Sequence, residues 1–330
     1  MTPMLCVDSL SIEIPVGATT LRPVRDVSFR VGRGELLCIV GESGCGKSLT
    51  SLAVMGLLPR GVKVSGGRIT LSGESLSALD ERKWSDVRGN RISMIFQEPM
   101  SSLNPVLTIG EQLTEGFVRH GRGTEREAEA RALHLLTTVR VANPEARMHQ
   151  YPHQLSGGLR QRVMIAMALM CEPDLLIADE PTTALDVTVQ VQVLKLLKTL
   201  QQELGISIVF VTHDLGVVAH IADRVMVMYG GEAVETGTAA QIFNRPAHPY
   251  TQGLLSCLPK PFQQGELGSI PGSVPAVWQE VNACIFANRC PRAVPRCTES
   301  RIGLVPVGDG HESRCIFAAE LAREQTEGCA

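Results

Sequence analysis

The stretch ELLCIVGESGCGKSLTSLAV (Glu35 to Val54) decides the fold of this chain. It opens with an apolar run, ELLCIV, that predicts a buried strand. A glycine-rich loop, GESGCGKS (Gly41 to Ser48), follows at once, and the residues after it predict a helix. Strand, glycine-rich loop and helix in this order are typical of a P-loop, in which backbone N–H groups surround phosphates. The stretch therefore predicts an α/β protein that binds a nucleoside triphosphate.

Within the loop, glycines permit backbone geometry that a Cβ would obstruct, above all at Gly41 and Gly46. We expect Lys47 to contact the β- and γ-phosphates and Ser48 to ligate Mg²⁺. The predicted nucleotide-binding residues are Gly41, Glu42, Ser43, Gly44, Cys45, Gly46, Lys47, Ser48 and Leu49. The alternative is a chance glycine-rich turn, and the strand before the loop and the helix after it argue against that.

A second apolar run, LLIADEP (Leu175 to Pro181), ends in two acidic residues. Asp179 follows four apolar residues, which predicts a position at the end of a buried strand, where it can hold the water shell of Mg²⁺. Glu180 is the expected general base for the attacking water, and a salt-bridged surface acid is the alternative. Together with the P-loop, this run predicts a Mg²⁺-dependent nucleoside triphosphatase.

Two further polar residues each end a predicted strand. Gln97 follows RISMIF, and we expect it to ligate the metal or the water. His213 follows ISIVFVT and is expected to contact the γ-phosphate. Either residue alone would more often be an ordinary polar residue at a strand end, but their order relative to the other motifs favours the catalytic interpretation.

The string LSGGLRQR (Leu155 to Arg162) predicts a second anion-binding helix N-terminus, with Ser156 as its N-cap. One subunit does not need two phosphate sites for one nucleotide. We therefore expect this string to bind ATP held by the P-loop of a second subunit, in ATPases that work as face-to-face pairs. The residues predicted at that interface are Ser156, Gly157, Gly158, Gln161 and, from ALDVT, Asp186.

The order of the patterns predicts the domain organisation. Residues 1 to about 80 predict antiparallel strands, residues from about 98 to 170 predict a helical subdomain, and strands then alternate with helices, as in a parallel sheet. VMVMYGGEAVETG (Val225 to Gly237) predicts a hairpin around Gly230 and Gly231. We divide the chain into an ATP-binding domain at 1–237 and a C-terminal extension at 238–330, where the composition shifts to Pro, Gly and Cys.

Composition excludes several classes of protein. The 330 residues carry a net charge of −3, so no basic field for nucleic acid is expected. The sequence contains no segment near the ~20 apolar residues that span a bilayer. The first residues, MTPMLCVDSLSIEIPV, do not match a signal peptide. We expect a cytoplasmic protein whose membrane role depends on a partner.

Four of the ten cysteines lie close together along the C-terminal extension: Cys284, Cys290, Cys297 and Cys315. Their spacing is not the C-x₂-C pairing of common zinc sites. An iron–sulfur cluster, Zn²⁺ and free thiols all remain open from the residues alone. The isolated cysteines are expected to be small buried residues: Cys6, Cys38, Cys45, Cys171 and Cys257.

These motifs together resemble the ATP-binding subunits of ABC transporters over the whole chain. The resemblance identifies Gly41 to Ser48 as Walker A, Gln97 as the glutamine loop, Leu155 to Gln161 as the signature and Leu175 to Glu180 as Walker B. The resemblance also identifies Ala184 to Asp186 as the D-loop and His213 as the switch histidine. It implies a RecA-like parallel-sheet core, an N-terminal antiparallel β subdomain, an inserted helical subdomain and a small cysteine-rich C-terminal module.

Finer strings, including FQEPMSSLNPVLTIGEQL, YPHQLSGG, HPYTQGLL and IPGSVP, resemble the bacterial peptide and nickel importers. The resemblance implies an ATPase at the cytoplasmic face of the inner membrane that energises uptake of dipeptides or oligopeptides. Its implied partners are a second, unlike ATPase subunit, two permease subunits that dock at the loop after Gln97, and an extracytoplasmic solute-binding protein. The implied cofactors are Mg²⁺ with ATP and a four-iron four-sulfur cluster on the tail cysteines.

Alternatives within and beyond this family remain open at this point. Nickel or another small solute would suit the same subunit type. A soluble ATPase acting on DNA or ribosomes usually has two cassettes or a long coiled coil, and neither occurs in this sequence; an exporter subunit is disfavoured by the HPY and IPG strings. The family usually has an aromatic residue over adenine where this chain has Ile14, so no adenine contact is predicted.

Overall fold

The computed structural model describes residues 2–97, 102–183, 185–258, 268–274 and 282–327. These residues form two compact units, which we describe separately. The P-loop unit contains Leu5–Arg30, Leu36–Leu76 and the chain from Val211 onward. The helical unit contains mainly Val31–Glu35 and Ser77–Phe210.

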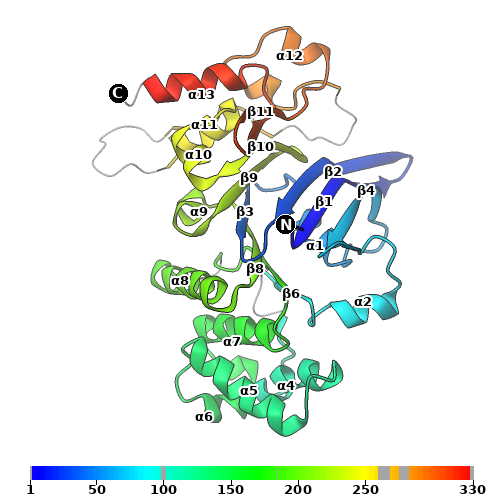
Figure 1. Cartoon of the computed structure of the whole chain (residues 1–330), viewed down its shortest axis with the longest axis vertical. Coiled ribbons are helices and arrows are strands. Elements are labelled where there is room, and N and C mark those ends of the chain that lie inside the picture. Colours follow the sequence, from blue (N-terminus) through cyan, green and yellow to red (C-terminus); the bar gives the residue numbers. More distant parts are fainter. Residues whose placement is uncertain (1, 98–101, 184, 259–267, 275–281, 328–330) are drawn as a thin grey trace. The chain divides into compact units, whose positions relative to one another are not determined.

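The first sheet of the P-loop unit is antiparallel, as predicted for the first 80 residues. Its strands lie in the order β2-β1-β4-β5, with antiparallel pairing of β1 with β4 and of β4 with β5 (Figure 1). Alternating apolar residues place Leu5 and Val7 in the core, and a register shift near Asp8 lets Leu10 and Ile12 also point inward. The strand bounds are β1 (Leu5–Val16), β2 (Thr19–Val31), β4 (Lys63–Leu71) and β5 (Glu74–Ser75).

A mixed sheet carries the Walker A loop. Its strands in this unit lie in the order β11-β12-β10-β9-β3, with β3 parallel to β9 and β9 antiparallel to β10. Every residue of β3 is buried, which confirms the prediction from ELLCIV. The predicted hairpin is also confirmed, since β9 and β10 flank Gly230 and Gly231, both at positive φ. The bounds are β3 (Leu36–Val40), β9 (Arg224–Tyr229), β10 (Glu232–Thr238), β11 (Val305–Gly308) and β12 (His311–Ser313).

The C-terminal residues are part of this same unit, so the prediction of a separate cysteine-rich module is not supported. Strand β12 pairs with β10, which continues the mixed sheet. Buried Glu232 lies 3.2 Å from Arg301, 3.6 Å from Arg314 and 3.8 Å from Arg25 of β2. The helices of the unit are α1 (Lys47–Val54), α9 (Leu215–Ile221), α10 (Ala239–Asn244), α11 (Pro249–Ser256), η2 (Ala287–Arg289), α12 (Arg296–Glu299) and α13 (Ala318–Glu327).

The helical unit combines parallel strands with a helical subdomain. Its strands lie in the order β8-β7-β6, with β6 parallel to β7, and the last residues of β8 belong to the other unit. The strands are β6 (Ile92–Ile95), β7 (Leu175–Asp179) and β8 (Ser207–Thr212). The helices are α2 (Glu81–Val87), α4 (Ile109–Arg119), α5 (Glu125–Thr138), α6 (Pro144–Met148), η1 (Pro152–Gln154), α7 (Gly157–Leu169) and α8 (Val187–Leu204).

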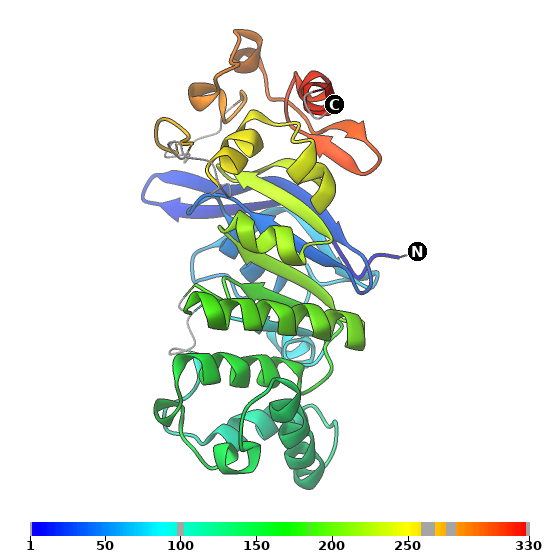
Figure 2. The same ribbon diagram turned by 90° about the vertical axis from the view of Figure 1, so that its left-hand side faces the viewer.

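Local signals account for the helix positions in this unit. The predicted capping box is present at α5, where Thr124 Oγ1 accepts the Glu127 N–H at 3.3 Å and Glu127 accepts the Thr124 N–H at 2.7 Å. Helices α7 and α8 lie side by side (Figures 1 and 2), and Arg162 of α7 donates to Gln192 Oε1 of α8 at 2.8 Å. In the described residues, no helix is long and apolar enough to span a membrane.

Candidate functional site

The Walker A loop joins buried β3 to the first residue of α1, Lys47. The Lys47 Nζ donates to the carbonyl oxygens of Gly41 at 2.8 Å and Glu42 at 3.1 Å, and only 5% of the residue is exposed. The ammonium group is therefore held within the loop at the N-terminus of a helix, where both the charge and the helix dipole favour an anion. Ser48 follows it on α1 and is exposed.

Two glycines in the loop are required by close packing. A Cβ on Gly41 would lie 2.1 Å from the Met228 carbonyl oxygen of β9 and 2.9 Å from Cys45 Sγ. Gly46 has φ +97, and its Cβ would lie 2.6 Å from the Pro23 carbonyl oxygen. The loop thus packs closely against β9 of the mixed sheet at Gly41 and against β2 of the antiparallel sheet at Gly46, and side chains at these positions would displace it. Cys45, a residue of the loop, has a buried side chain. Burial raises the pKa of its thiol, and the charge of Lys47 opposes this shift.

In the helical unit, the structure brings two of the predicted catalytic residues together. Asp179 is the buried last residue of β7 and Glu180 comes next, with φ +45. Gln97 Nε2 donates to Glu180 Oε2 at 3.2 Å, and Thr183 Oγ1 donates to the same oxygen at 2.9 Å. Left-handed backbone at a residue with a Cβ costs about 1–2 kcal/mol, so the surrounding turn must hold Glu180 in this orientation.

Gln97 lies two residues beyond the end of β6 at Ile95. The observed strand is therefore shorter than the strand predicted from RISMIF. The predicted docking loop after Gln97 begins with residues 98–101, which lie outside the described residues.

In the P-loop unit, His213 directly follows β8 and is exposed, while the next residue, Asp214, N-caps α9. Ile14 is half-buried in β1.

The signature residues occupy the start of α7. Ser156 is its N-cap, as predicted, and accepts the Leu159 N–H at 3.4 Å. A Cβ on Gly158 would lie 3.1 Å from Val189 Cγ1 of α8, so this glycine permits close approach of the two helices. Asp186 N-caps α8 by accepting the Val189 N–H at 3.0 Å. Gln161 is buried on α7, and Gly157 has nothing within 4 Å of its Cβ position.

Sequence reasoning missed two residues that contact the Walker A loop from far along the chain. The Glu42 N–H donates to Tyr250 Oη at 3.0 Å, and Arg289 pairs with the Glu42 carboxylate at 2.8 Å. A carboxylate inside a phosphate-binding loop was the signal that a cation must lie nearby. The sequence did not indicate which of its arginines supplies that cation.

The tail cysteines are near one another but do not form a metal site in this arrangement. The Cys284 N–H donates to the Cys297 carbonyl oxygen at 2.8 Å. Burial raises the pKa of Cys315 to about 11, and the neighbouring thiols of Cys290 and Cys284 add to the shift. Among the described residues, no group of three or more His, Cys, Asp or Glu side chains is placed to hold a metal ion. The nine described cysteines are free, so the prediction of a cluster is not supported here.

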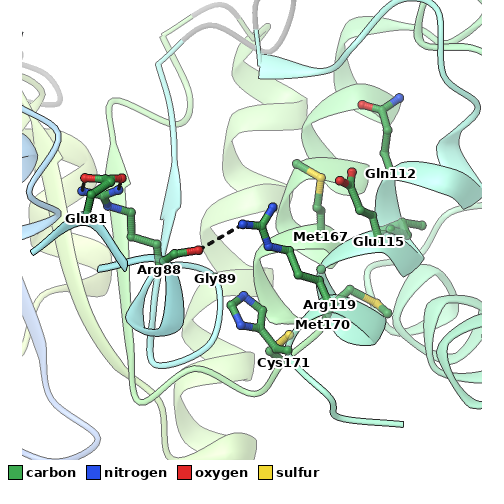
Figure 3. Close-up of a pocket in the computed structure, with 13 residues that line it drawn as sticks. Glu81, Arg88, Gly89, Gln112, Glu115, Arg119, Met167, Met170 and Cys171 are labelled. Atoms are coloured by element: carbon green, nitrogen blue, oxygen red, sulfur yellow. Dashed lines mark hydrogen bonds and ion pairs between the residues drawn. The ribbon is translucent and has the colours of Figure 1, made fainter. Parts of the chain in front are cut away.

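A surface cleft of about 390 Å³ lies in the helical unit between α2, α4 and the end of α7 (Figure 3). Charged residues line it, including the Glu81–Arg88 ion pair and Arg119, which donates to Ser85 Oγ at 3.1 Å. Met167, Met170 and Cys171 contribute its sulfur-containing part. Adaptable methionines with a charged rim are typical of surfaces that receive a protein partner.

Comparison with known proteins agrees with this geometry. A family model described as ABC transporter matches residues 24–183, and one described as oligopeptide/dipeptide transporter, C-terminal region, matches residues 234–297. The dipeptide transport ATP-binding protein DppD of Bacillus subtilis is 47% identical over 324 residues, covering 98% of this chain and 97% of that protein. The oligopeptide transport ATP-binding protein AppD of the same organism is 50% identical over 307 residues, covering 92% and 93%.

Among solved structures, a dimeric ATP-binding cassette bound to ADP and phosphate matches with a TM-score of 0.65 and 29% identity. The match covers 72% of this chain and 99% of that one. The fold described above, with its antiparallel β subdomain and mixed sheet, is therefore the α/β fold of these cassettes.

Proposed function

This chain belongs to the ABC transporter family of ATP-binding proteins, in its oligopeptide/dipeptide branch, and we propose that it is the ATP-hydrolysing subunit of a peptide importer. The observation that carries the proposal is the presence in one chain of the cassette region at 24–183 and the oligopeptide/dipeptide C-terminal region at 234–297. The protein acts at the cytoplasmic face of the membrane, together with permease subunits and a solute-binding protein. We keep the predicted boundary at 237/238 as the limit of the ATP-binding domain.

We assign the chemistry of ATP hydrolysis to residues of the Walker A, Walker B, glutamine-loop and switch-histidine motifs described above. Lys47 binds the β- and γ-phosphates, and Glu180 acts as general base for the attacking water. His213 contacts the γ-phosphate. Ser48, Gln97 and Asp179 supply hydroxyl, amide and carboxylate oxygens, the donor types that Mg²⁺ prefers, and the ion would neutralise phosphate charge when bound.

The hydrogen bond from Gln97 to Glu180 supports a linked role for these two residues. A glutamine that donates to the base holds the carboxylate in one orientation. Any movement of the segment after Gln97 would then change the orientation of the base, which is how a permease partner would influence hydrolysis.

The signature residues serve the ATP of a second cassette, in our proposal. Exposed Ser156 at the N-terminus of α7 supports this role, because the end of a helix attracts an anion. We assign Gly157, Gly158, Gln161 and Asp186 to the same interface. Ser156→Arg should abolish hydrolysis in the paired cassettes while the Walker A loop of the same isolated subunit still binds nucleotide. Loss of binding by that isolated subunit would contradict the assignment.

The cleft in Figure 3 is the described surface that we assign to a cytoplasmic helix of the permease. The importer function is tested by affinity purification of the Glu180→Gln chain from detergent-treated membranes with ATP and Mg²⁺. Two polytopic membrane proteins and a second ATPase should accompany it, and the identity of the solute-binding protein encoded with them separates peptide from nickel uptake. Adding Arg119→Glu should remove the membrane proteins but keep the second ATPase. Recovery of ribosomes or DNA-bound proteins instead would contradict the importer function.

We also keep a four-iron four-sulfur cluster on Cys284, Cys290, Cys297 and Cys315 as a proposal, supported by the family resemblance. Their arrangement in the structure does not present a ligand set, so no step of hydrolysis depends on it. Anaerobically purified protein should be brown, with matching iron and sulfide that are lost in Cys297→Ser and kept in Cys257→Ser. A colourless protein with stoichiometric zinc would refute the cluster.

A further inference from the structure

The Walker A loop contains a carboxylate, Glu42, at a place where the loop must attract a triphosphate. A negative charge there opposes binding, because two like charges repel across the short distances within a phosphate site. Glu42 is only partly exposed, since 27% of its side chain is accessible, so solvent does not fully screen it. The loop therefore needs a compensating positive charge other than Lys47, whose ammonium serves the phosphates.

Arg289 supplies that charge through a bidentate contact with the Glu42 carboxylate. Its Nη1 lies 2.8 Å from Glu42 Oε2, and its Nη2 lies 3.2 Å from Glu42 Oε1. The Arg289 side chain is 6% exposed. A bidentate pair of this kind fixes orientation as well as charge, which a lysine cannot reproduce. The contact raises the pKa of Arg289 further, so the guanidinium stays protonated.

The remaining N–H groups of Arg289 donate to the C-terminal segment and to Tyr229 of β9. Nε donates to the Pro271 carbonyl oxygen at 2.9 Å, and Nη2 donates to the Ile270 carbonyl oxygen at 3.1 Å. Gly272, at φ +79, lies against this side chain, since its Cβ would be 3.4 Å from Arg289 Cγ. Nη1 also donates to Tyr229 Oη at 3.3 Å. The guanidinium is thus held in place before any nucleotide binds.

Glu42 transmits this constraint to the loop through its backbone. Its N–H donates to Tyr250 Oη at 3.0 Å, and its carbonyl oxygen accepts the Cys45 N–H at 3.3 Å. The same carbonyl oxygen accepts Lys47 Nζ at 3.1 Å. The side chain, N–H and C=O of one residue are therefore all engaged. The C-terminal contacts hold the side chain and the N–H, and the C=O holds the phosphate-binding lysine.

We propose that Arg289 is a positioning residue for ATP, which neutralises and orients Glu42 so that the Walker A loop accepts the triphosphate. The inference rests on the proposed assignment of ATP to this loop. It gives the oligopeptide/dipeptide C-terminal region a role in nucleotide affinity, since this region matches residues 234–297 and contains both Arg289 and Tyr250. A chain whose C-terminal segment is not folded would bind ATP poorly.

The test is titration of the full chain with a fluorescent ATP analogue. Arg289→Ala should weaken binding about tenfold at low ionic strength, and the loss should shrink at high salt because the exposed charge is then screened. Glu42→Gln should bind at least as well as the wild type, because it removes the repulsive charge. The double variant Glu42→Gln/Arg289→Ala should bind within about twofold of Glu42→Gln, since no carboxylate remains to be compensated.

The rescue in the double variant separates positioning from a merely structural role. If Arg289 only supported the fold, removing the carboxylate would not restore affinity. The matched control is Arg292→Ala, which loses an exposed ion pair to Glu324 in the same segment and should bind ATP normally. Wild-type affinity in Arg289→Ala, or a double variant as weak as Arg289→Ala, would overturn the inference. A wild-type chain that does not bind the analogue would instead overturn the nucleotide assignment itself.

Discussion

Acidification should destabilise the P-loop unit through His248, the first residue of the HPY string and the N-cap of α11. Its Nδ1 accepts the Tyr250 backbone N–H at 3.1 Å, and only 2% of the residue is exposed. Burial lowers the pKa of His248 from 6.5 to about 3; the positive charge of Arg314 adds to the shift, and a hydrogen bond with the Arg314 backbone opposes it. The ring is therefore neutral in the folded protein at every pH well above 3.

The magnitude follows from proton linkage. In the unfolded chain His248 binds a proton near its ordinary pKa, so between 6.5 and about 3 the unfolded state holds more protons than the folded state. The stabilisation is fully present above the unfolded pKa and is lost as the pH falls towards the folded pKa. Each pH unit within this window lowers the free energy of unfolding by about 1.4 kcal/mol. From pH 7.5 to pH 5.0 the loss due to this residue is about 2 kcal/mol.

Urea unfolding of the wild type and of His248→Asn at these two pH values measures the effect. Asparagine retains an N-cap acceptor but does not titrate, so the variant isolates the proton. The wild type should lose about 2 kcal/mol more than the variant between the two conditions. His220→Asn, an exposed histidine of α9, is the control and should follow the wild type. Equal acid losses in wild type and His248→Asn would refute the reasoning.

Three other changes, the last with a matched control variant, test the residues assigned to the nucleotide site. Lys47→Ala should abolish binding of the ATP analogue, because it removes the phosphate-binding ammonium; unchanged turnover would contradict its role. Glu180→Gln should bind ATP but hydrolyse it about 10²–10⁴-fold more slowly in a phosphate-release assay, and near-normal hydrolysis would exclude it as the base. Gly41→Ala places a Cβ 2.1 Å from a carbonyl oxygen and should cost about 1–3 kcal/mol of unfolding free energy. Gly44→Ala, which meets nothing within 4 Å, should cost only about 1 kcal/mol of backbone strain, and a larger loss than at Gly41 would contradict the packing argument.

Patterns that lie within one stretch of chain were predictable from the sequence alone. The Walker A strand, loop and helix occupy consecutive residues, and the capping box at Thr124 and Glu127 spans a single helical turn. The hairpin at Gly230 and Gly231 likewise depends on neighbouring residues. In such cases hydrophobic period, capping and turn chemistry act over a few residues, so local sequence specifies local structure. The family resemblance then supplied the functional interpretation of these local motifs.

Contacts between distant parts of the chain were decided only by the tertiary structure. Glu42 and Arg289 are 247 residues apart, and Gln97 and Glu180 are 83 apart, yet each pair forms hydrogen bonds. The tail that its composition marked as a separate module instead pairs β12 with β10 and places Arg314 beside buried Glu232. A composition count says which charges and thiols a chain has, but not which of them the fold brings together. That choice depends on the order in which strands pair and on what each buried charge needs as a partner.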